Sequence, residues 1–213
     1  MSGAPIALLG GTFNPVHVGH LRIALDAREW LGVHQVLLVP AGLPPLKEKP
    51  GVSAEHRAKM VQLAVADMPE LSVDLRELER GGTSYTVETL AQCRQEQGAE
   101  TSLTFIMGVD ALLTLDRWRR WSELLTLTNI AIMMRPGSQL PQRGVIAQWL
   151  RGHRVEPREL RNRPAGAVAV VEQPPLAISS TDLRAAINAG KNVRFLLPDP
   201  VMEYIHEHEL YRQ

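Results

Sequence analysis

Short apolar runs alternate with longer amphipathic segments along this chain, and this alternation restricts the possible folds more than any other feature of the sequence. The run Val36–Val39, for example, is apolar without interruption, which is typical of a strand buried on both faces. The expected strands span residues 6–9, 35–40, 71–75, 103–107, 129–134 and 167–171, and the expected helices span 18–31, 53–67, 84–97, 145–150, 180–189 and 199–211. This order predicts an α/β fold: a doubly wound, mostly parallel sheet with helices on both faces.

Length and charge exclude several classes of protein. A chain of 213 residues fits one domain better than two, so we expect residues 1–213 to form a single domain. Lysine plus arginine and aspartate plus glutamate number 23 each, and this balance argues against nucleic-acid and membrane partners. The first residues carry no basic, apolar signal segment, and the single cysteine, Cys93, cannot form an internal disulfide. We therefore expect a soluble cytoplasmic protein in which Cys93 is a buried or bystander thiol.

A glycine-rich segment follows the first expected strand, where doubly wound sheets bind their ligands. The segment reads Gly10, Gly11, Thr12, Phe13, Asn14, Pro15, Val16, His17, Val18, Gly19, His20. Its first glycines let backbone N–H groups approach an anion, and the helix that follows adds the positive end of its dipole. His17 and His20 are three residues apart and share one face of the first helical turn, while Gly19 removes a side chain where a ligand must pack. The segment therefore predicts a phosphate site in which two imidazoles donate hydrogen bonds.

Other interpretations of this segment stay open. Its spacing matches neither the G-x-G-x-x-G dinucleotide fingerprint nor the P-loop. A structural explanation is a glycine-rich turn with two histidines that are satisfied by their surroundings. A His-x-x-His metal pair is a further alternative, but it lacks a third ligand nearby, because Asp26 lies on a later turn.

A second polar segment, Ile178–Arg184, opens the helix that follows the last expected strand. Hydroxyl groups and free N–H groups gather at Ser179, Ser180 and Thr181, and Arg184 lies one turn into the helix. An ordinary helix N-cap would explain the hydroxyl groups alone. The arginine at the same end favours phosphate binding.

These two segments resemble the signatures of the nucleotidyltransferase superfamily. Gly10–His20 is similar to the H-x-G-H signature, and Ile178–Arg184 is similar to I-S-S-T-x-x-R. Between them, Thr83–Thr86 and Gly108–Trp118 resemble the nicotinate-mononucleotide adenylyltransferases of bacterial NAD synthesis, and the resemblance covers nearly the whole chain. It implies a Rossmann-like nucleotidyltransferase fold. It also implies transfer of an adenylyl group from ATP to nicotinate mononucleotide, which gives nicotinate adenine dinucleotide (deamido-NAD) and pyrophosphate.

The resemblance also implies roles for single residues. His17 and His20 would contact the triphosphate and the transferring phosphate, Arg184 would hold the adenylate end and its phosphates, and Asp110 would hold a ribose. Lys47, from the proline-rich loop after the second strand, would reach the phosphates. The implied catalytic residues are His17, His20, Lys47 and Arg184. The implied ATP site comprises Gly10, Gly11, Thr12, Phe13, His17, Gly19, His20, Gly108, Asp110, Ile178, Ser179, Ser180, Thr181 and Arg184.

The acceptor, nicotinate mononucleotide, would bind at the middle motifs. Tyr85 and Thr86 would meet its carboxylate and Trp118 would stack on its ring. The full implied set is Asn14, Lys47, Thr83, Tyr85, Thr86, Trp118 and Arg119. Arg119 occupies a position that is often aromatic in relatives, and Asn14 one that is often aspartate. From the residues alone, Lys47 is equally explained as a solvated lysine, Asp110 as the cap of a helix at 111–115, and Trp118 or its neighbour Trp121 as a core residue.

The implied cofactor is Mg²⁺ carried on the ATP phosphates, with no fixed protein site. Sister transferases that act on nicotinamide mononucleotide, phosphopantetheine or a sugar or choline phosphate share the same signatures. A silent nucleotide-binding sensor is a further alternative, which the histidines and Arg184 disfavour. An aminoacyl-tRNA synthetase core is excluded, because the chain is too short for a tRNA-binding domain and has no basic tract. The sequence assigns no oligomeric state.

Overall fold

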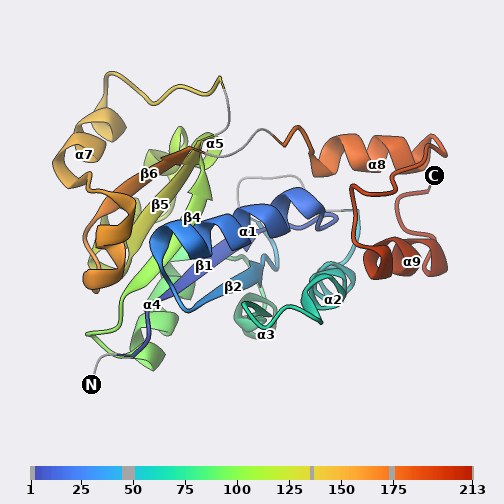
Figure 1. Ribbon diagram of the computed structural model, residues 1–213, viewed down its shortest axis with the longest axis horizontal. Helices are drawn as coiled ribbons and strands as arrows, with labels where there is room; N and C mark the ends of the chain where they lie inside the picture. Colours follow the sequence, from blue (N-terminus) through green and yellow to red (C-terminus); the bar gives the residue numbers. More distant parts are fainter. Residues whose placement is uncertain (1–2, 45–50, 135–136, 173–175, 213) are drawn as a thin grey trace.

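Six parallel strands form one sheet at the centre of the protein (Figure 1). The computed structural model describes residues 3–44, 51–134, 137–172 and 176–212. The strand order is β3-β2-β1-β4-β5-β6, so the chain starts in the middle and winds outward in both directions. The strands are β1 (Ile6–Gly11), β2 (Gln35–Pro40), β3 (Leu71–Val73), β4 (Leu103–Gly108), β5 (Asn129–Met134) and β6 (Val168–Glu172). The carboxyl ends of β1 and β4 part at the point where the order reverses.

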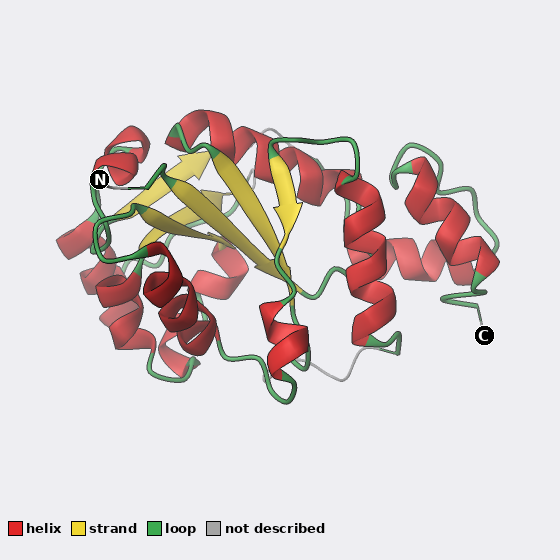
Figure 2. Cartoon of the chain, turned by 90° about the horizontal axis from the view of Figure 1, so that it is seen from below, coloured by secondary structure: helices red, strands yellow, loops and turns green. Residues whose placement is uncertain are grey.

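Helices cover both faces of the sheet, as Figure 2 shows. The α-helices are α1 (Val18–Leu31), α2 (Ala54–Val65), α3 (Arg76–Arg80), α4 (Thr86–Gln97), α5 (Val109–Leu112), α6 (Leu124–Leu127), α7 (Val145–His153), α8 (Ser180–Asn188) and α9 (Asp199–Glu207). Short 3-10 segments span η1 (Leu115–Arg117), η2 (Trp121–Glu123) and η3 (Pro157–Asn162). None of the described helices is long and apolar enough to cross a membrane.

Alternate residues of each strand point into two separate cores. Ala7 and Leu9 pack with the apolar sides of α1, α2, α9 and η3, whereas Leu8 packs with α4, α6 and α7. Both sets are buried, so the strands read as continuous apolar runs in the sequence. Cys93 lies in the second core, on α4, which confirms the expected buried thiol.

The predicted fold class is confirmed, and so are most elements. Helix α1 has the predicted bounds, and Gly32 ends it in the left-handed conformation, with φ of 64°. Ser53 caps α2 as expected, because its side chain accepts a hydrogen bond from the backbone N–H of His56.

Several predicted bounds are wrong. Strand β1 continues through the glycine pair to Gly11, where a turn was expected, because the parallel ladder to β2 runs on to Pro40. Helix α4 begins at Thr86 rather than at residue 84, the short helix α3 was not predicted, and the last helix ends at Glu207 rather than at residue 211.

Candidate active site

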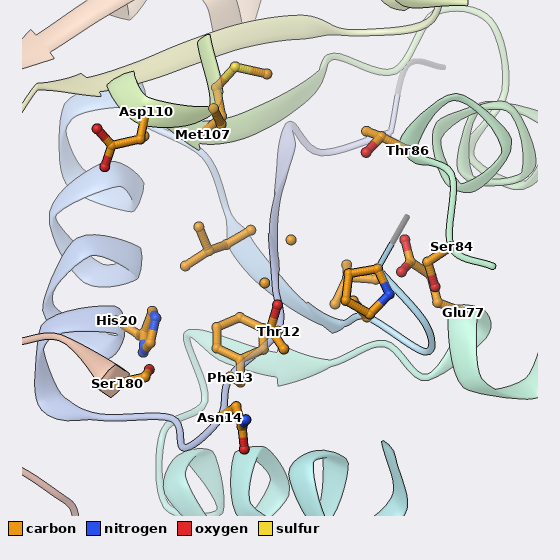
Figure 3. Close-up of a pocket in the computed structure, with 18 of the residues that line it drawn as sticks. Thr12, Phe13, Asn14, His20, Glu77, Ser84, Thr86, Met107, Asp110 and Ser180 are labelled. Atoms are coloured by element: carbon orange, nitrogen blue, oxygen red, sulfur yellow. The ribbon is translucent and has the colours of Figure 1, made fainter. Parts of the chain in front are cut away.

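A cavity of about 1710 Å³ opens at the carboxyl edge of the sheet, between the ends of β1 and β4. This is the switch point at which doubly wound folds bind ligands. A drug-sized ligand typically occupies about 300–1,000 Å³, so the cavity has room for two nucleotide-sized molecules. Figure 3 shows His20, Asp110 and Ser180 on one side of this cavity, and Thr86, Ser84 and Glu77 on the other.

The cavity brings together most of the predicted site residues. Those that line it are Gly10, Gly11, Thr12, Phe13, Asn14, His20, Tyr85, Thr86, Gly108, Asp110, Trp118, Arg119, Ser180, Thr181 and Arg184. Those that do not line it are His17, Gly19, Thr83, Ile178 and Ser179. Lys47 lies outside the described residues, so its predicted role stays a prediction.

His17 and His20 form a stacked pair at the start of α1. Their ring centroids are 3.7 Å apart, and the backbone N–H of His17 donates to Nδ1 of His20 at 3.3 Å. A ring nitrogen that accepts a hydrogen bond carries no proton, so neutral His20 carries its proton on Nε2 and can donate from there. Within this pair His17 is buried, while His20 reaches the cavity. The pair therefore acts as a unit in which one ring supports the other.

The glycines of this segment make room for rings as well as for a ligand. A Cβ atom at Gly19 would meet Nδ1 of His17 at 3.0 Å, so the predicted reason for this glycine is wrong: it admits the His17 ring. A Cβ atom at Gly11 would meet the Phe13 ring at 2.9 Å. Phe13 itself is buried, with φ of 48°, and its ring lies 5.0 Å from that of His20, edge to face. The loop is thus shaped by aromatic packing.

The start of α8 is tied to the same loop. The Ser180 hydroxyl donates to the carbonyl of Pro15 at 2.9 Å, and Nη1 of Arg184 donates to the carbonyl of Asn14 at 2.8 Å. Ser179 is an ordinary N-cap, because its Oγ accepts from the backbone N–H of Asp182 at 3.1 Å. The N-cap interpretation therefore holds for Ser179, and phosphate binding by Arg184 stays a prediction. Arg184 keeps further guanidinium N–H groups at the cavity wall.

Aromatic and charged side chains form the other end of the cavity. The guanidinium of Arg119 lies 4.6 Å from the centre of the Tyr85 ring and 3.2 Å from a carboxylate oxygen of Glu88. Trp118 lines the cavity and touches Phe105 edge to face. Trp121 instead packs on Trp149 of α7, so Trp118 is the tryptophan available to a ligand.

At this end the structure rejects one alternative for Asp110, and it places Thr83 outside the cavity lining. Asp110 does not cap a helix at 111–115, because α5 begins at Val109 and its cap is Gly108. The Asp110 side chain instead lines the cavity. Thr83 is exposed and pairs with Leu43 in an isolated bridge, so its backbone joins two loops.

The sequence analysis missed three residues around the cavity. Glu77 of α3 is a buried carboxylate at the cavity wall, which accepts a hydrogen bond from the Thr89 hydroxyl at 2.6 Å. Tyr211, from the C-terminal tail, donates its hydroxyl proton to Oδ1 of Asn14 at 2.7 Å. Burial raises the pKa of Tyr211, although Arg184 and Arg57 oppose this shift. The third is Arg57, which lies behind two loops of the site. The glutamate and the arginine sit in helices and the tyrosine at the chain end, where the local sequence marks no site.

Comparison with known sequences assigns the chain to a family. Residues 8–186 match the sequence profile of the Cytidylyltransferase-like family. A protein of Cellvibrio japonicus named "Probable nicotinate-nucleotide adenylyltransferase" is 44% identical over 207 residues, which are 97% of this chain and 98% of that protein. A protein of Aeromonas salmonicida with the same name is 44% identical over 213 residues, 100% of this chain and 99% of that protein. This chain belongs to the nicotinate-nucleotide adenylyltransferase family.

Solved structures of nicotinic acid mononucleotide adenylyltransferase share its fold. That of Plasmodium falciparum complexed with NaAD has a TM-score of 0.74 at 16% identity and covers 98% of both chains. The same enzyme complexed with APC has a TM-score of 0.72 at 15% identity, again over 98% of both chains. At such identities the likeness concerns the fold, and it confirms the predicted nucleotidyltransferase architecture. The resemblance to the nicotinate-nucleotide adenylyltransferase family is confirmed by the sequence relatives.

Proposed function

We propose that this protein transfers the adenylyl group of ATP to nicotinate mononucleotide and releases nicotinate adenine dinucleotide and pyrophosphate. One observation carries this proposal: a single cavity of about 1710 Å³ joins a histidine-lined, glycine-rich end to an aromatic end with a cation. The names of the relatives support the same reaction.

ATP would bind with its phosphates against the start of α1 and the start of α8. The free N–H groups and dipoles of two helix ends, both of more than eight residues, favour anions there. His20 would donate from Nε2 to the phosphate that is transferred, and Arg184 would offer its planar donors to the polyphosphate. Asp110, at the carboxyl end of β4, would accept hydrogen bonds from a ribose.

The acceptor's phosphate would attack the α-phosphorus of ATP in line, and pyrophosphate would leave from the opposite side. A phosphate dianion is already a competent nucleophile, so the step needs no general base. Catalysis then rests on positioning and on stabilising the charge that develops on the α-phosphate oxygens. His20 and the loop N–H groups are the donors aimed at that charge.

Mg²⁺ would enter with ATP. Within the described part of the chain, no three His, Cys, Asp or Glu side chains form a group that could hold a metal. When bound, the ion would neutralise charge on the triphosphate. The protein residues nearest that triphosphate would be His20 and Arg184.

The nicotinate carboxylate would lie near Tyr85, Thr86 and Arg119. Helix α4 begins at Thr86, so N–H groups of its first turn point toward this end of the cavity. The Arg119 guanidinium, held by the Tyr85 ring and paired with Glu88, adds N–H donors at the same place. An amide in place of the carboxylate would lose the charge-assisted hydrogen bonds. At roughly 1.5–3 kcal/mol each, two such bonds give a preference of about 10²–10⁴ for the acid.

The experiment measures pyrophosphate release from ATP and Mg²⁺ with nicotinate mononucleotide, nicotinamide mononucleotide, phosphopantetheine and choline phosphate as separate acceptors. We expect the highest kcat/KM with nicotinate mononucleotide. Equal values for the acid and the amide would contradict the acceptor assignment and leave adenylyl transfer standing. No release with any acceptor, from protein that binds ATP, would favour the sensor instead.

A further inference from the structure

Among the described residues, Arg57 has the largest fully buried side chain. It belongs to the first turn of α2 and is 1% exposed, although arginine is rarely buried unless it is paired. It does not line the cavity, so it is no candidate for contact with a substrate. Its position needs another explanation.

The guanidinium joins two loops. Its Nη1 donates to the carbonyl of Thr12 at 2.8 Å and to that of Ala41 at 2.6 Å, and its Nη2 donates to the carbonyl of Gly42 at 2.8 Å. Thr12 follows β1 in the glycine-rich loop, while Ala41 and Gly42 follow β2. One planar group therefore fixes the distance between the loops that leave two neighbouring strands.

These contacts extend the pairing past the end of the strands. The backbone N–H of Ala41 donates to the carbonyl of Gly11, the last residue of β1, at 2.8 Å. Beyond it, Arg57 supplies the connection. Gly42 in turn donates to Oγ of Ser84 at 2.9 Å, next to Tyr85 at the acceptor end. A continuous chain of hydrogen bonds thus runs from Thr12, in the glycine-rich loop, through Arg57 and Gly42 to Ser84 at the acceptor end.

The charge of Arg57 is compensated weakly. Among the described residues, only carbonyl oxygens accept hydrogen bonds from the guanidinium, and Nε has no partner. Burial lowers the pKa of Arg57. Isolated buried charges are costly, and a purely structural link between loops can be built from neutral groups. Arg57 lies directly behind a loop that would bind anions, so the negative charge of bound substrates would offset the positive charge of its guanidinium.

We propose that Arg57 is a positioning residue. It sets the spacing between the loop at Thr12, which would bind ATP, and the loop at Ala41 and Gly42, which leads to the acceptor end, and it so aligns the two phosphates for in-line attack. This inference rests on the proposed adenylyl transfer. It predicts that loss of the planar guanidinium weakens the binding of both substrates and slows the chemical step, because misplacement by about 1 Å can cost about 10²-fold in rate.

The test compares Arg57→Lys with Arg94→Lys. Arg94 is a matched control, because its guanidinium also donates to several carbonyls, among them those of Thr101 and Pro164 at 2.6 Å. Both acceptors precede strands, so Arg94 lies at the opposite edge of the sheet from the cavity. Each variant is assayed for Tm, for kcat, for the KM of both substrates, and for the Kd of ATP and of nicotinate mononucleotide by calorimetry.

We expect both variants to lower Tm, but only Arg57→Lys to lower kcat/KM, by about 10²-fold, with a higher KM and Kd for both substrates. Wild-type kcat and KM values in Arg57→Lys, together with a lower Tm, would overturn the proposal and leave a packing role. A change confined to one substrate would also overturn it. If the wild-type protein shows no turnover, the adenylyl transfer is wrong, and the two Kd values still decide the role of Arg57.

A second variant covers the case in which Arg57→Lys does not fold. Gly42→Ala strains the same junction from the other side, since its Cβ would meet the carbonyl of Glu77 at 3.1 Å and Oγ of Ser84 at 3.2 Å. The proposal predicts a lower kcat with a raised acceptor KM. Unchanged kinetics in Gly42→Ala would contradict it.

Discussion

His17 and His20 lie on one turn of α1 but have different tasks. His17 is buried and stacks under its partner, whereas His20 reaches the cavity. In the proposed reaction His20 is therefore the residue that contacts the phosphate, and the His17 ring supports it.

His20→Ala removes one donor aimed at the transferring phosphate. We expect kcat to fall by about 10²–10³, the range for loss of one transition-state donor, with a smaller change in the Kd for ATP. Steady-state kinetics and calorimetry measure the two quantities. His17→Ala serves as the comparison and should cost the same or less. A near-wild-type kcat in His20→Ala would remove it from the mechanism.

Trp118→Ala tests the aromatic end of the cavity. A ring stacked on a pyridine contributes roughly 1–3 kcal/mol, by analogy with base–aromatic stacking. We therefore expect a higher KM for nicotinate mononucleotide and an unchanged KM for ATP. Trp121→Ala is the matched control, because its ring packs on Trp149 instead of the cavity. Equal effects of the two substitutions on the acceptor KM would show that Trp118 acts through packing.

Local sequence patterns predicted two of the segments that contribute to the cavity wall. Gly10–His20 and Ile178–Arg184 each combine a helix start with donors, and both reach the cavity. The role of Arg57 was not predicted, because an arginine in a helix normally lies at the surface and nothing near it in sequence indicates burial. Tyr211 escaped for another reason: it lies 197 positions from Asn14, its hydrogen-bond partner, and such a contact exists only in the folded chain.

At the scale of elements, the C-terminal tail acts as part of the site. Helix α9 packs on α2, and the chain then turns back with positive φ values at Glu209 and Tyr211, of 50° and 64°. This path brings the Tyr211 hydroxyl to Asn14, beside the carbonyl bound by Arg184. The tail thus adds a second side-chain contact to the loop between β1 and α1, besides that of Arg57.

Tyr211→Phe removes this hydrogen bond and keeps the ring. A net hydrogen bond contributes about 0.5–1.5 kcal/mol, so we expect the KM for ATP to rise about 2–10-fold. Tyr204→Phe is the matched control, since its hydroxyl bonds Nδ1 of His56 at 2.8 Å and neither residue lines the cavity. The two variants are compared by steady-state kinetics with ATP varied. A KM effect of equal size in both would point to a general loosening of α9.

Sequence patterns predicted some elements better than others. Central strands and long helices follow from uninterrupted apolar runs and from caps such as Ser53 and Gly32. Helix α3 has only five residues, Arg76–Arg80, too few for a periodic pattern. The extension of β1 to Gly11 depends on pairing with β2, which no single-strand pattern contains.

For the whole molecule, the buried thiol of Cys93 links stability to pH. Burial raises the pKa of Cys93 from 9.0 to about 11. The folded state therefore retains the thiol proton longer than the unfolded state. The resulting stability is complete below pH 9 and is lost as pH rises from about 9 to 11, by up to roughly 2–3 kcal/mol.

Urea unfolding at pH 8 and at pH 10.5 measures this effect. We expect the wild-type protein to lose more stability between these values than Cys93→Ala does, because the variant lacks the titrating thiol. Other groups that titrate in this range are common to both proteins and cancel in the difference. Parallel losses in the two proteins would contradict the shifted pKa.

The same thiol can report local opening of the folded protein. The chain has a single cysteine, it is buried on α4, and thiol reagents react with the thiolate. Alkylation of Cys93 therefore requires that α4 moves away from the sheet, and the alkylation rate measures how often this local opening occurs. Helix α4 starts at the acceptor end of the cavity, so an acceptor that binds there should slow the alkylation of Cys93. The alkylation rate would then measure occupancy of the acceptor site without any turnover of substrate.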